Sequence, residues 1–121
     1  KYYVVDIAFK QLLLPDINRD RGHVLENIVY LELRRRGYTV YVGQLTKGEI
    51  DFVAQKPGGI LEYYQVSESV LDPTTRDREL APLEAVKDQY PKFLLTMDEL
   101  YKPHNYNGIQ QCNVLDWLIG M

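Results

Sequence analysis

Apolar and polar positions alternate through the middle of the chain in a way that predicts three strands. Residues 38–42, 49–55 and 60–67 are rich in β-branched and aromatic side chains, and this composition with a period of two is typical of half-buried strands. Lys56-Pro57-Gly58-Gly59 separates the last two runs. Because proline presets the first turn position and glycine permits a positive φ at the next, we expect these two runs to form an antiparallel hairpin.

Helical spacing predicts a helix of about fifteen residues before the first of these strands. The helix is expected to begin at Gly22 and His23, after a polar loop over 16–22, and to end before Gly37, a residue type common just after helices. Its predicted apolar face comprises Val24, Leu25, Ile28, Val29 and Leu31. Glu26 is expected at the margin of this face, beside Leu33.

A second helix is predicted over residues 74–87, after the strand 60–67. Asp72 has the side chain of an N-cap and Pro73 suits the first helical position. Pro82 lies inside this helix, so we expect a bend or a split near Leu80.

Shorter elements complete the predicted order. Residues 1–6 favour a strand, 7–14 a helix that ends at Pro15, Lys92–Thr96 a buried strand, and 109–114 a strand after the turn Asn107-Gly108. A terminal helix is expected to begin at Asp116 and to end near Gly120. This order predicts an α/β fold in which helices cover both faces of a mixed sheet.

Composition limits the classes of function. With 121 residues the chain suits one domain, and its net charge of −3 provides no overall field that favours nucleic acid. No apolar run approaches the roughly 18–20 residues that span a membrane, so we expect no membrane partner. A single cysteine, Cys112, excludes an internal disulfide and fits the cytoplasm; we expect it half-buried in a strand. Because the chain opens on Lys1, we expect it to be a piece of a longer protein.

Acidic and amide residues occur in a distinctive order along the predicted helix, strand and hairpin between residues 22 and 67. Glu26 lies on the first helix, Gly48-Glu49-Ile50-Asp51 begins the second strand, and Gln65-Val66-Ser67 ends the third. From Gly22 to Ser67 this pattern resembles the restriction-endonuclease-like, or PD-(D/E)XK, nuclease superfamily. The resemblance implies a three-layer fold with a mixed central sheet.

The chain resembles more narrowly a nuclease-like domain of unknown function at the C-terminus of many predicted AAA-type ATPases of bacteria and archaea. This resemblance implies that 16–121 form the nuclease-like domain. It also implies that 1–15 are either the end of an upstream winged-helix-like segment or a first strand and helix. The features that carry it are Arg19 to Asn27, Tyr41-Val42-Gly43, Glu49 to Ala54, Tyr64-Gln65-Val66, Arg78-Glu79, Tyr90-Pro91-Lys92 and Asn107-Gly108-Ile109.

The superfamily resemblance assigns a role to each position of the site. Two carboxylates and a backbone carbonyl hold a divalent cation such as Mg²⁺, and a lysine assists the attack of water. Asp51 and Glu26 match two acidic positions, whereas Gln65 stands in place of the second strand carboxylate and Ser67 in place of the lysine. The implied catalytic constellation of Glu26, Asp51, Gln65 and Ser67 is therefore degenerate, with Asp51 and Glu26 left as weak metal ligands at most.

Strand alternation predicts which neighbours can join this site. Gln65 and Ser67 are expected on one face of their strand, with Glu26 and Asp51 facing the same cleft and Ser67 at its edge. Glu62 and Glu68 have the opposite parity, and Lys47 reaches the site only if its loop folds over it. His23 and His104 are expected to be capping or surface residues. Taken by themselves, the residues leave open that Asp51 is an exposed strand position and Glu26 an ordinary charge at a helix margin.

Arg34, Arg35 and Arg36 close the first helix and admit two interpretations. Arginines at a helix C-terminus complement the helix dipole and its free carbonyls. The alternative is a nucleic-acid-binding patch that contacts phosphates.

Three functions follow as hypotheses. The first is a catalytically degenerate module of an ATPase that recognises nucleic acid or a protein, with ATP and Mg²⁺ bound by the upstream ATPase domain and no cofactor, or weak Mg²⁺, here. The second is an active Mg²⁺-dependent nuclease, and the third is a structural domain that supports homo-oligomerisation. The exchanged residues Gln65 and Ser67 weigh against the second.

Overall fold

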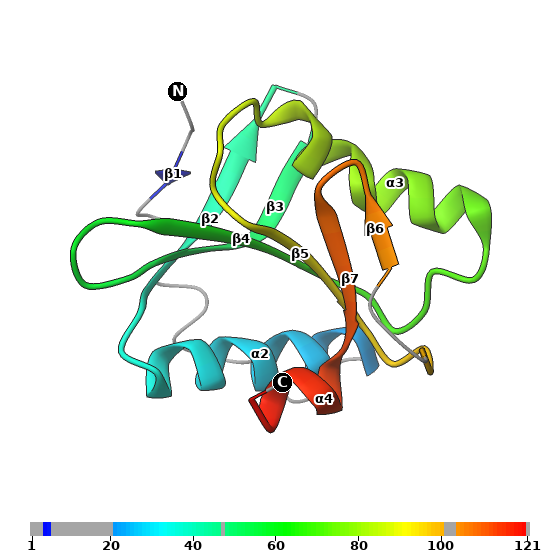
Figure 1. Cartoon of the computed structure of the whole chain (residues 1–121), viewed down its shortest axis with the longest axis horizontal. Helices are drawn as coiled ribbons and strands as arrows, with labels where there is room; N and C mark the ends of the chain where they lie inside the picture. Colours follow the sequence, from blue (N-terminus) through cyan, green and yellow to red (C-terminus); the bar gives the residue numbers. More distant parts are fainter. Residues whose placement is uncertain (1–3, 6–20, 47, 101–103, 121) are drawn as a thin grey trace.

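The computed structural model describes residues 4–5, 21–46, 48–100 and 104–120, and in these parts of the chain seven strands form one mixed sheet in the order β1-β2-β3-β4-β5-β7-β6 (Figure 1). The helices are α2 (Arg21–Arg35), α3 (Pro73–Ala85) and α4 (Val114–Leu118). The strands are β1 (Val4–Val5), β2 (Thr39–Leu45), β3 (Gly48–Gln55), β4 (Leu61–Val66), β5 (Lys92–Thr96), β6 (His104–Tyr106) and β7 (Ile109–Asn113).

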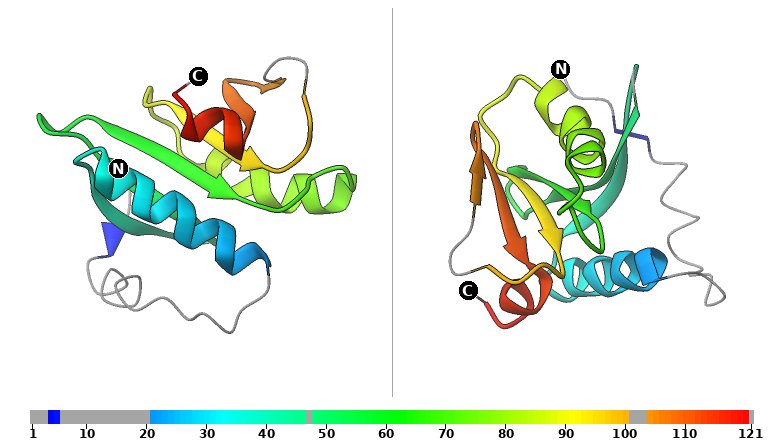
Figure 2. Two further views of the ribbon diagram at one scale, coloured as in Figure 1. Left: turned by 90° about the horizontal axis from the view of Figure 1, so that it is seen from below. Right: turned by 90° about the vertical axis from the view of Figure 1, so that its right-hand side faces the viewer.

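Helices cover both faces of the sheet, which confirms the predicted α/β class. α2 and α4 lie on one face and α3 on the other (Figures 1 and 2). The first face buries Val29, Leu33 and Phe52 in one apolar cluster, and the second buries Val53 and Leu83 in another. None of the helices in the described ranges is long and apolar enough to cross a membrane.

The predicted hairpin is present. β3 pairs antiparallel with β4, and the register places Phe52 opposite Tyr64. At the turn the Lys56 N–H donates to the Ile60 carbonyl at 2.8 Å, and Gly58 and Gly59 have φ values of 101° and 94°. β5 then runs parallel to β4 after the crossover through α3.

The predicted apolar face of α2 is only partly correct. Leu25 and Val29 are buried against the sheet, together with Tyr30 and Leu33, which the predicted face did not include. The other predicted positions face outward, and the exposed fractions are 48% for Val24, 37% for Ile28 and 60% for Leu31. The helix carries apolar residues on two opposite sides and only one side can pack on the sheet, so spacing alone did not identify the buried side.

Several predicted boundaries differ from the structure. α2 begins at Arg21, inside the predicted loop 16–22, and β2 extends to Leu45. Two predicted strands are shorter than expected, because β4 covers Leu61–Val66 and β7 ends at Asn113. The prediction missed β6, which pairs with β7.

The predicted helix boundaries also need correction. α4 begins at Val114 and not at Asp116, because Asn113 is its N-cap and accepts the Leu115 N–H at 2.8 Å. α3 ends at Ala85 and is not split at Pro82, which lies buried inside it. The predicted strand 1–6, except β1, lies outside the described residues, as do the helix 7–14, Lys47 and the segment 1–15 apart from β1.

A β-bulge interrupts β3 beside β2. Tyr41 lies opposite Val53 and Gly43 opposite Ile50, so that Asp51 and Phe52 together oppose the single residue Val42. The bulge places both Ile50 and Val53 on the α3 side of the sheet. Such bulges re-aim a side chain out of the strand alternation, and here the side chain concerned is Asp51.

Gly43 permits the close packing beside this bulge. A Cβ atom at Gly43 would lie 2.9 Å from Cγ2 of Val53 and 3.2 Å from Cβ of Ile50. The two side chains that the bulge brings to one face therefore need a residue without a side chain opposite them.

We predict that Gly43→Ala destabilises the protein by about 1–3 kcal/mol, because the added methyl group overpacks the bulge. Urea unfolding followed by circular dichroism measures the change. Thr39→Ala, an exposed position in the same strand, is the matched control. Equal stability of Gly43→Ala and the unaltered protein would contradict this account of the bulge.

Candidate functional site between β3 and β4

Two side chains bridge β3 and β4 where the main-chain pairing ends at Phe52 and Tyr64. Oε1 of Gln65 accepts the Asp51 N–H at 2.7 Å, and Oδ2 of Asp51 accepts the Val66 N–H at 2.9 Å. Each side chain thus accepts a hydrogen bond from the opposite strand, in place of a main-chain carbonyl. We call this reciprocal pair of bonds the Asp51–Gln65 brace.

The amide nitrogen of Gln65 extends the brace to α3. Nε2 donates to the Glu79 carbonyl at 3.1 Å and lies 3.4 Å from the Glu49 carbonyl. The Glu79 carbonyl belongs to the turn of α3 that precedes Pro82, so this bond joins the end of β4 to α3. Only 2% of Gln65 is exposed. A buried residue at this position must therefore both accept and donate, which an amide does and a carboxylate does not.

Negative charge accumulates around Asp51. Burial raises the pKa of Asp51 well above its ordinary value, and the charge of Glu26 raises it further, as do Glu79 and Glu49. The bond from the Val66 N–H opposes this rise in pKa. Burial also raises the pKa of Glu79, against the effect of the neighbouring Arg78.

The carboxylates approach Asp51 from both sides of the sheet. Glu26 belongs to α2 and Glu79 to α3, which cover opposite faces (Figure 2). Because Asp51 lies at the bulge, both charges act on it. The structure therefore brings Glu26, Asp51 and Gln65 to one region of the fold.

A cavity of about 330 Å³ opens beside the brace on the α3 side. The predicted cleft is confirmed for Asp51 and Gln65, which line it. The prediction placed Glu26 in this cleft and Ser67 at its edge, and neither residue is among the described residues that line the cavity. The described lining residues are Gly48, Glu49, Asp51, Gln65, Arg78, Glu79, Ala81 and Pro82.

Ser67 departs from the predicted position because β4 ends at Val66. The Ser67 N–H donates to the Leu95 carbonyl at 3.0 Å, and its hydroxyl donates to the Ser69 carbonyl at 3.2 Å. The alternation of a strand no longer applies beyond the last strand residue.

Other predictions for neighbouring residues are confirmed. Glu62 accepts the Tyr64 hydroxyl at 2.7 Å and pairs with Lys56 at 3.0 Å, away from the brace. His23 and His104 are exposed, and Cys112 is half-buried in β7.

Sequence reasoning missed Glu79, Glu49 and Arg78 as site residues. Arg78-Glu79 was one of the features that carried the family resemblance, but α3 lies far from Asp51 along the chain. No sequence spacing within one helix or strand relates Arg78 and Glu79 to Asp51, and only the crossover through α3 brings them together.

The described residues, as arranged, do not fit a Mg²⁺ ion. No group of three His, Cys, Asp or Glu side chains among them is placed to hold a metal. Oε1 of Gln65 is occupied by the Asp51 N–H, and Nε2 is a donor, which repels a cation. At the position that the resemblance assigns to a metal-binding carboxylate, the side chain therefore forms hydrogen bonds with main-chain groups.

The three arginines at the end of α2 have partners within the protein. Arg34 donates to the Tyr30 hydroxyl at 3.0 Å, and Arg35 forms two bonds with Glu32. Arg36 also pairs with Glu32 at 2.7 Å, donates to the Trp117 carbonyl at 2.8 Å, and stacks 4.4 Å from the centre of the Trp117 ring. Bonds from Arg35 and Arg36 lower the pKa of Glu32 to about 2. These contacts favour the structural interpretation of the cluster, since Arg34 and Arg35 bond within α2 and Arg36 joins its end to α4.

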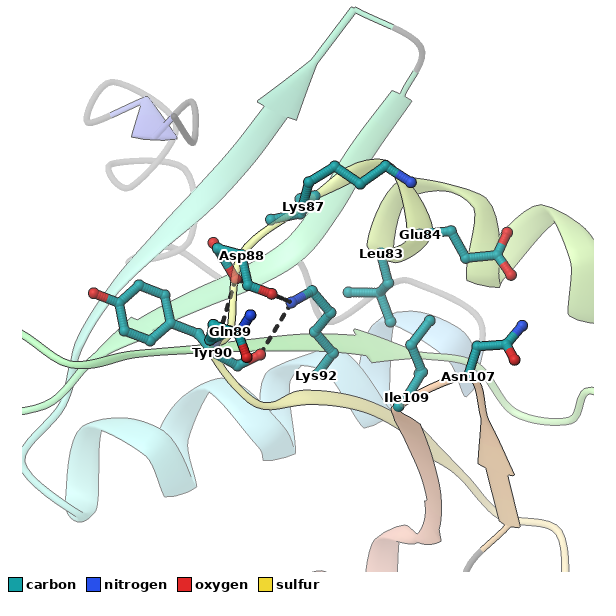
Figure 3. Close-up of a pocket in the computed structure, with 11 residues that line it drawn as sticks. Leu83, Glu84, Lys87, Asp88, Gln89, Tyr90, Lys92, Asn107 and Ile109 are labelled. Carbon is teal, nitrogen blue, oxygen red and sulfur yellow. Dashed lines mark hydrogen bonds and ion pairs between the residues drawn. The ribbon is translucent and has the colours of Figure 1, made fainter.

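A larger cavity, of about 610 Å³, lies beside the C-terminal end of α3 and the start of β5 and β7 (Figure 3). Lys92 lines it, and its ammonium donates to Oδ1 of Asp88 at 3.0 Å and to the carbonyls of Asp88 and Tyr90. All three donors of Lys92 are thus used within the fold. The Lys92 ammonium therefore stabilises the loop after α3.

We predict that Gln65→Glu lowers the free energy of unfolding at pH 7 by about 3 kcal/mol, because a buried carboxylate would face two carbonyls and Asp51. Chemical denaturation at pH 7 and pH 5 measures the loss, which should shrink at pH 5 as the new carboxyl takes up a proton. Gln110→Glu, at an exposed position of β7, is the matched control. A loss no greater than that of the control would show that the Gln65 amide does not hold the strands.

We predict that the stability contributed by the Asp51 carboxyl is lost as the pH rises. Because the folded-state pKa is raised, folding favours the protonated form. The contribution is fully present below the unfolded pKa, near 3.9, and disappears as the pH passes the folded value. Asp51→Asn keeps an oxygen for the Val66 N–H and should be more stable than the unaltered protein at pH 8 but not at pH 4.

Thermal unfolding between pH 4 and pH 8 measures this difference, with Asp77→Asn, at an exposed α3 position, as control. Parallel pH profiles for Asp51→Asn and the unaltered protein would contradict the proposed charge crowding.

Comparison with known proteins finds two relatives that are each named an uncharacterized protein. One, from Haemophilus influenzae, is 39% identical over 119 residues, which are 98% of this chain and 28% of the relative. The other, from Methanocaldococcus jannaschii, is 34% identical over 93 residues, which are 73% of this chain and 20% of the relative. No protein-family model matches the chain, and no solved structure matches it significantly. The chain spans less than a third of the length of these relatives.

Proposed function

We propose that the chain is a restriction-endonuclease-like domain without nuclease chemistry, which acts as a protein-recognition module within a longer AAA-type ATPase. The bonds of Gln65 are the observation that carries this proposal. Its buried amide bonds Asp51 and Glu79 at the position that the family resemblance assigns to a metal-binding carboxylate. This arrangement replaces a cation by hydrogen bonds between β3, β4 and α3.

The order of the elements supports the proposed fold family. α2 carries Glu26, β3 carries Asp51, and β4 returns with Gln65, and these three groups lie close together. That is the arrangement expected from the resemblance. The exchanges at Gln65 and Ser67 remove one ligand and one cation from it, and Ser67 bonds elsewhere.

Charge favours a protein over a nucleic acid as the partner. Glu49, Asp51 and Glu79 line the cavity with Arg78, and this excess of carboxylates repels phosphates. Arg35 and Arg36 pair with Glu32, which reduces their capacity to bind phosphate. The length of the relatives supports the further proposal that the chain works as part of a longer polypeptide.

We predict that the unaltered protein does not cleave DNA or RNA in the presence of Mg²⁺ or Mn²⁺. Loss of one electrostatic contact to the transition state typically costs ~10²–10³ in rate, and two are replaced here. Single- and double-stranded substrates should be tested with the unaltered protein, Asp51→Ala and the double variant Gln65→Glu/Ser67→Lys.

Metal-dependent cleavage by the unaltered protein that Asp51→Ala abolishes would sink this proposal and favour the active nuclease. Cleavage by the double variant alone would support the proposal, because the site would then have kept its geometry and lost only the two groups that the chemistry requires. Since Gln65→Glu is expected to destabilise the fold, circular dichroism should accompany each assay.

A further inference from the structure

A second cluster of buried polar side chains lies near the carboxyl ends of the parallel strands β5 and β7. Thr96, Asp98 and Gln111 are all buried there. Nε2 of Gln111 donates to Oγ1 of Thr96 at 3.1 Å, and Oε1 of Gln111 accepts the Tyr106 hydroxyl at 3.0 Å. Ligands of α/β sheets commonly bind outside the carboxyl ends of parallel strands, so the cluster lies at an edge of the sheet that suits a binding site.

This cluster borders a cavity of about 130 Å³. The ring of Tyr106 joins the groups around it, since its centre lies 6.0 Å from Cζ of Arg76 and 6.3 Å from the centre of the His104 ring. Arg76 belongs to the first turns of α3 and Tyr106 to β6, so two elements distant in sequence meet beside the cavity (Figure 1). Val70 and Leu71 add apolar lining.

Asp98 has one carboxylate oxygen that the fold does not use. Oδ2 accepts the Val70 N–H at 2.9 Å and lies 3.4 Å from Nε2 of Gln111. Within the described ranges no group donates to the other oxygen, Oδ1, and no fully buried side-chain oxygen lacks a partner. Oδ1 is therefore accessible from the cavity. A carboxylate that is only 9% exposed is costly without a cation nearby, and Asp98 has no ion pair with a described residue.

Arg76 offers a positive charge to the same cavity. Its ion pair with the exposed Asp77 is long, at 3.8 Å, and its guanidinium forms no hydrogen bond with another described residue. A guanidinium binds a carboxylate through two parallel hydrogen bonds. The positive end of the α3 dipole, near Arg76, also favours a negative group.

We propose that this cavity binds a small aliphatic α-amino acid. The guanidinium of Arg76 binds the carboxylate of the ligand, Oδ1 of Asp98 accepts its ammonium, and Val70 and Leu71 contact its side chain. A ligand with a single charge would leave Asp98 or Arg76 unmatched, whereas a zwitterion matches both. The inference is independent of the proposed function, because no residue of the Asp51–Gln65 brace takes part.

The size of the cavity limits the ligand to a short side chain. Its volume of about 130 Å³ corresponds to roughly four molecules of liquid water. Alanine suits this space, and long or aromatic side chains do not.

Titration with L-alanine, followed by two-dimensional NMR spectra of the unaltered protein, tests the inference. We expect saturable shifts of the Val70 and Arg76 main-chain amides and of the Gln111 side-chain amide. The dissociation constant should be on the order of 1 mM, because a ligand with so few atoms gains little binding energy. Propionate, which lacks the ammonium, and ethylamine, which lacks the carboxylate, should bind at least about tenfold more weakly.

Two variants test the two charges separately. Arg76→Gln and Asp98→Asn should each weaken the binding of alanine at least about tenfold. The asparagine keeps an oxygen for the Val70 N–H, so the hydrogen bond of the fold is retained. Glu84→Gln and Lys87→Gln are the matched controls, since they remove one charge of each sign at exposed positions near the other end of α3. The controls should bind alanine as the unaltered protein does.

Absence of a saturable shift at about 100 mM alanine, roughly a hundredfold above the expected dissociation constant, would overturn the inference. Equal affinities for alanine and propionate would also overturn it, because Asp98 would then have no part in binding. The comparison of the three ligands uses the unaltered protein, so it decides the question even where a variant fails to fold.

Discussion

The pairing of β3 with β4 beyond Phe52 and Tyr64 depends on side chains. Asp51 and Gln65 each accept a main-chain N–H of the opposite strand, at 2.9 and 2.7 Å. A buried N–H without an acceptor costs about 1–3 kcal/mol, so the two bonds matter to the whole sheet. The Gln65 amide also bonds the Glu79 carbonyl, and through it the position of α3 depends on the same residue.

The brace lies at the position where the family resemblance leads us to expect a metal centre, and it joins β3 to β4 by hydrogen bonds. In a metal centre the cation offsets the repulsion between carboxylates. Here the Gln65 amide stands at the position that the resemblance assigns to one carboxylate, and it supplies both a donor and an acceptor. Crowding nevertheless persists, because burial, Glu26, Glu79 and Glu49 all raise the pKa of Asp51.

The bulge in β3 connects the core to this site. It places Ile50 and Val53 on one face, requires the absence of a side chain at Gly43, and turns Asp51 towards β4. Core packing and site geometry are therefore coupled, because the bulge that places Ile50 and Val53 in the core also turns Asp51 towards β4. The outer surface is organised separately: among the described residues, α2 and α4 with its C-cap carry five of the eight exposed large apolar residues, and α3 carries none.

The sequence by itself determined the strands other than β6, the β3–β4 hairpin and the α/β class, because alternation, helical spacing and turn residues act over short distances. It also placed Asp51 and Gln65 together, since a hairpin fixes which residues of its two strands are neighbours. Only the tertiary structure decided that Glu79 joins them, that Ser67 does not, and which of the two apolar sides of α2 is buried. Those outcomes depend on the crossover through α3, the last residue of β4 and the packing of α2 on the sheet. They are contacts between segments distant in sequence, which no local pattern encodes.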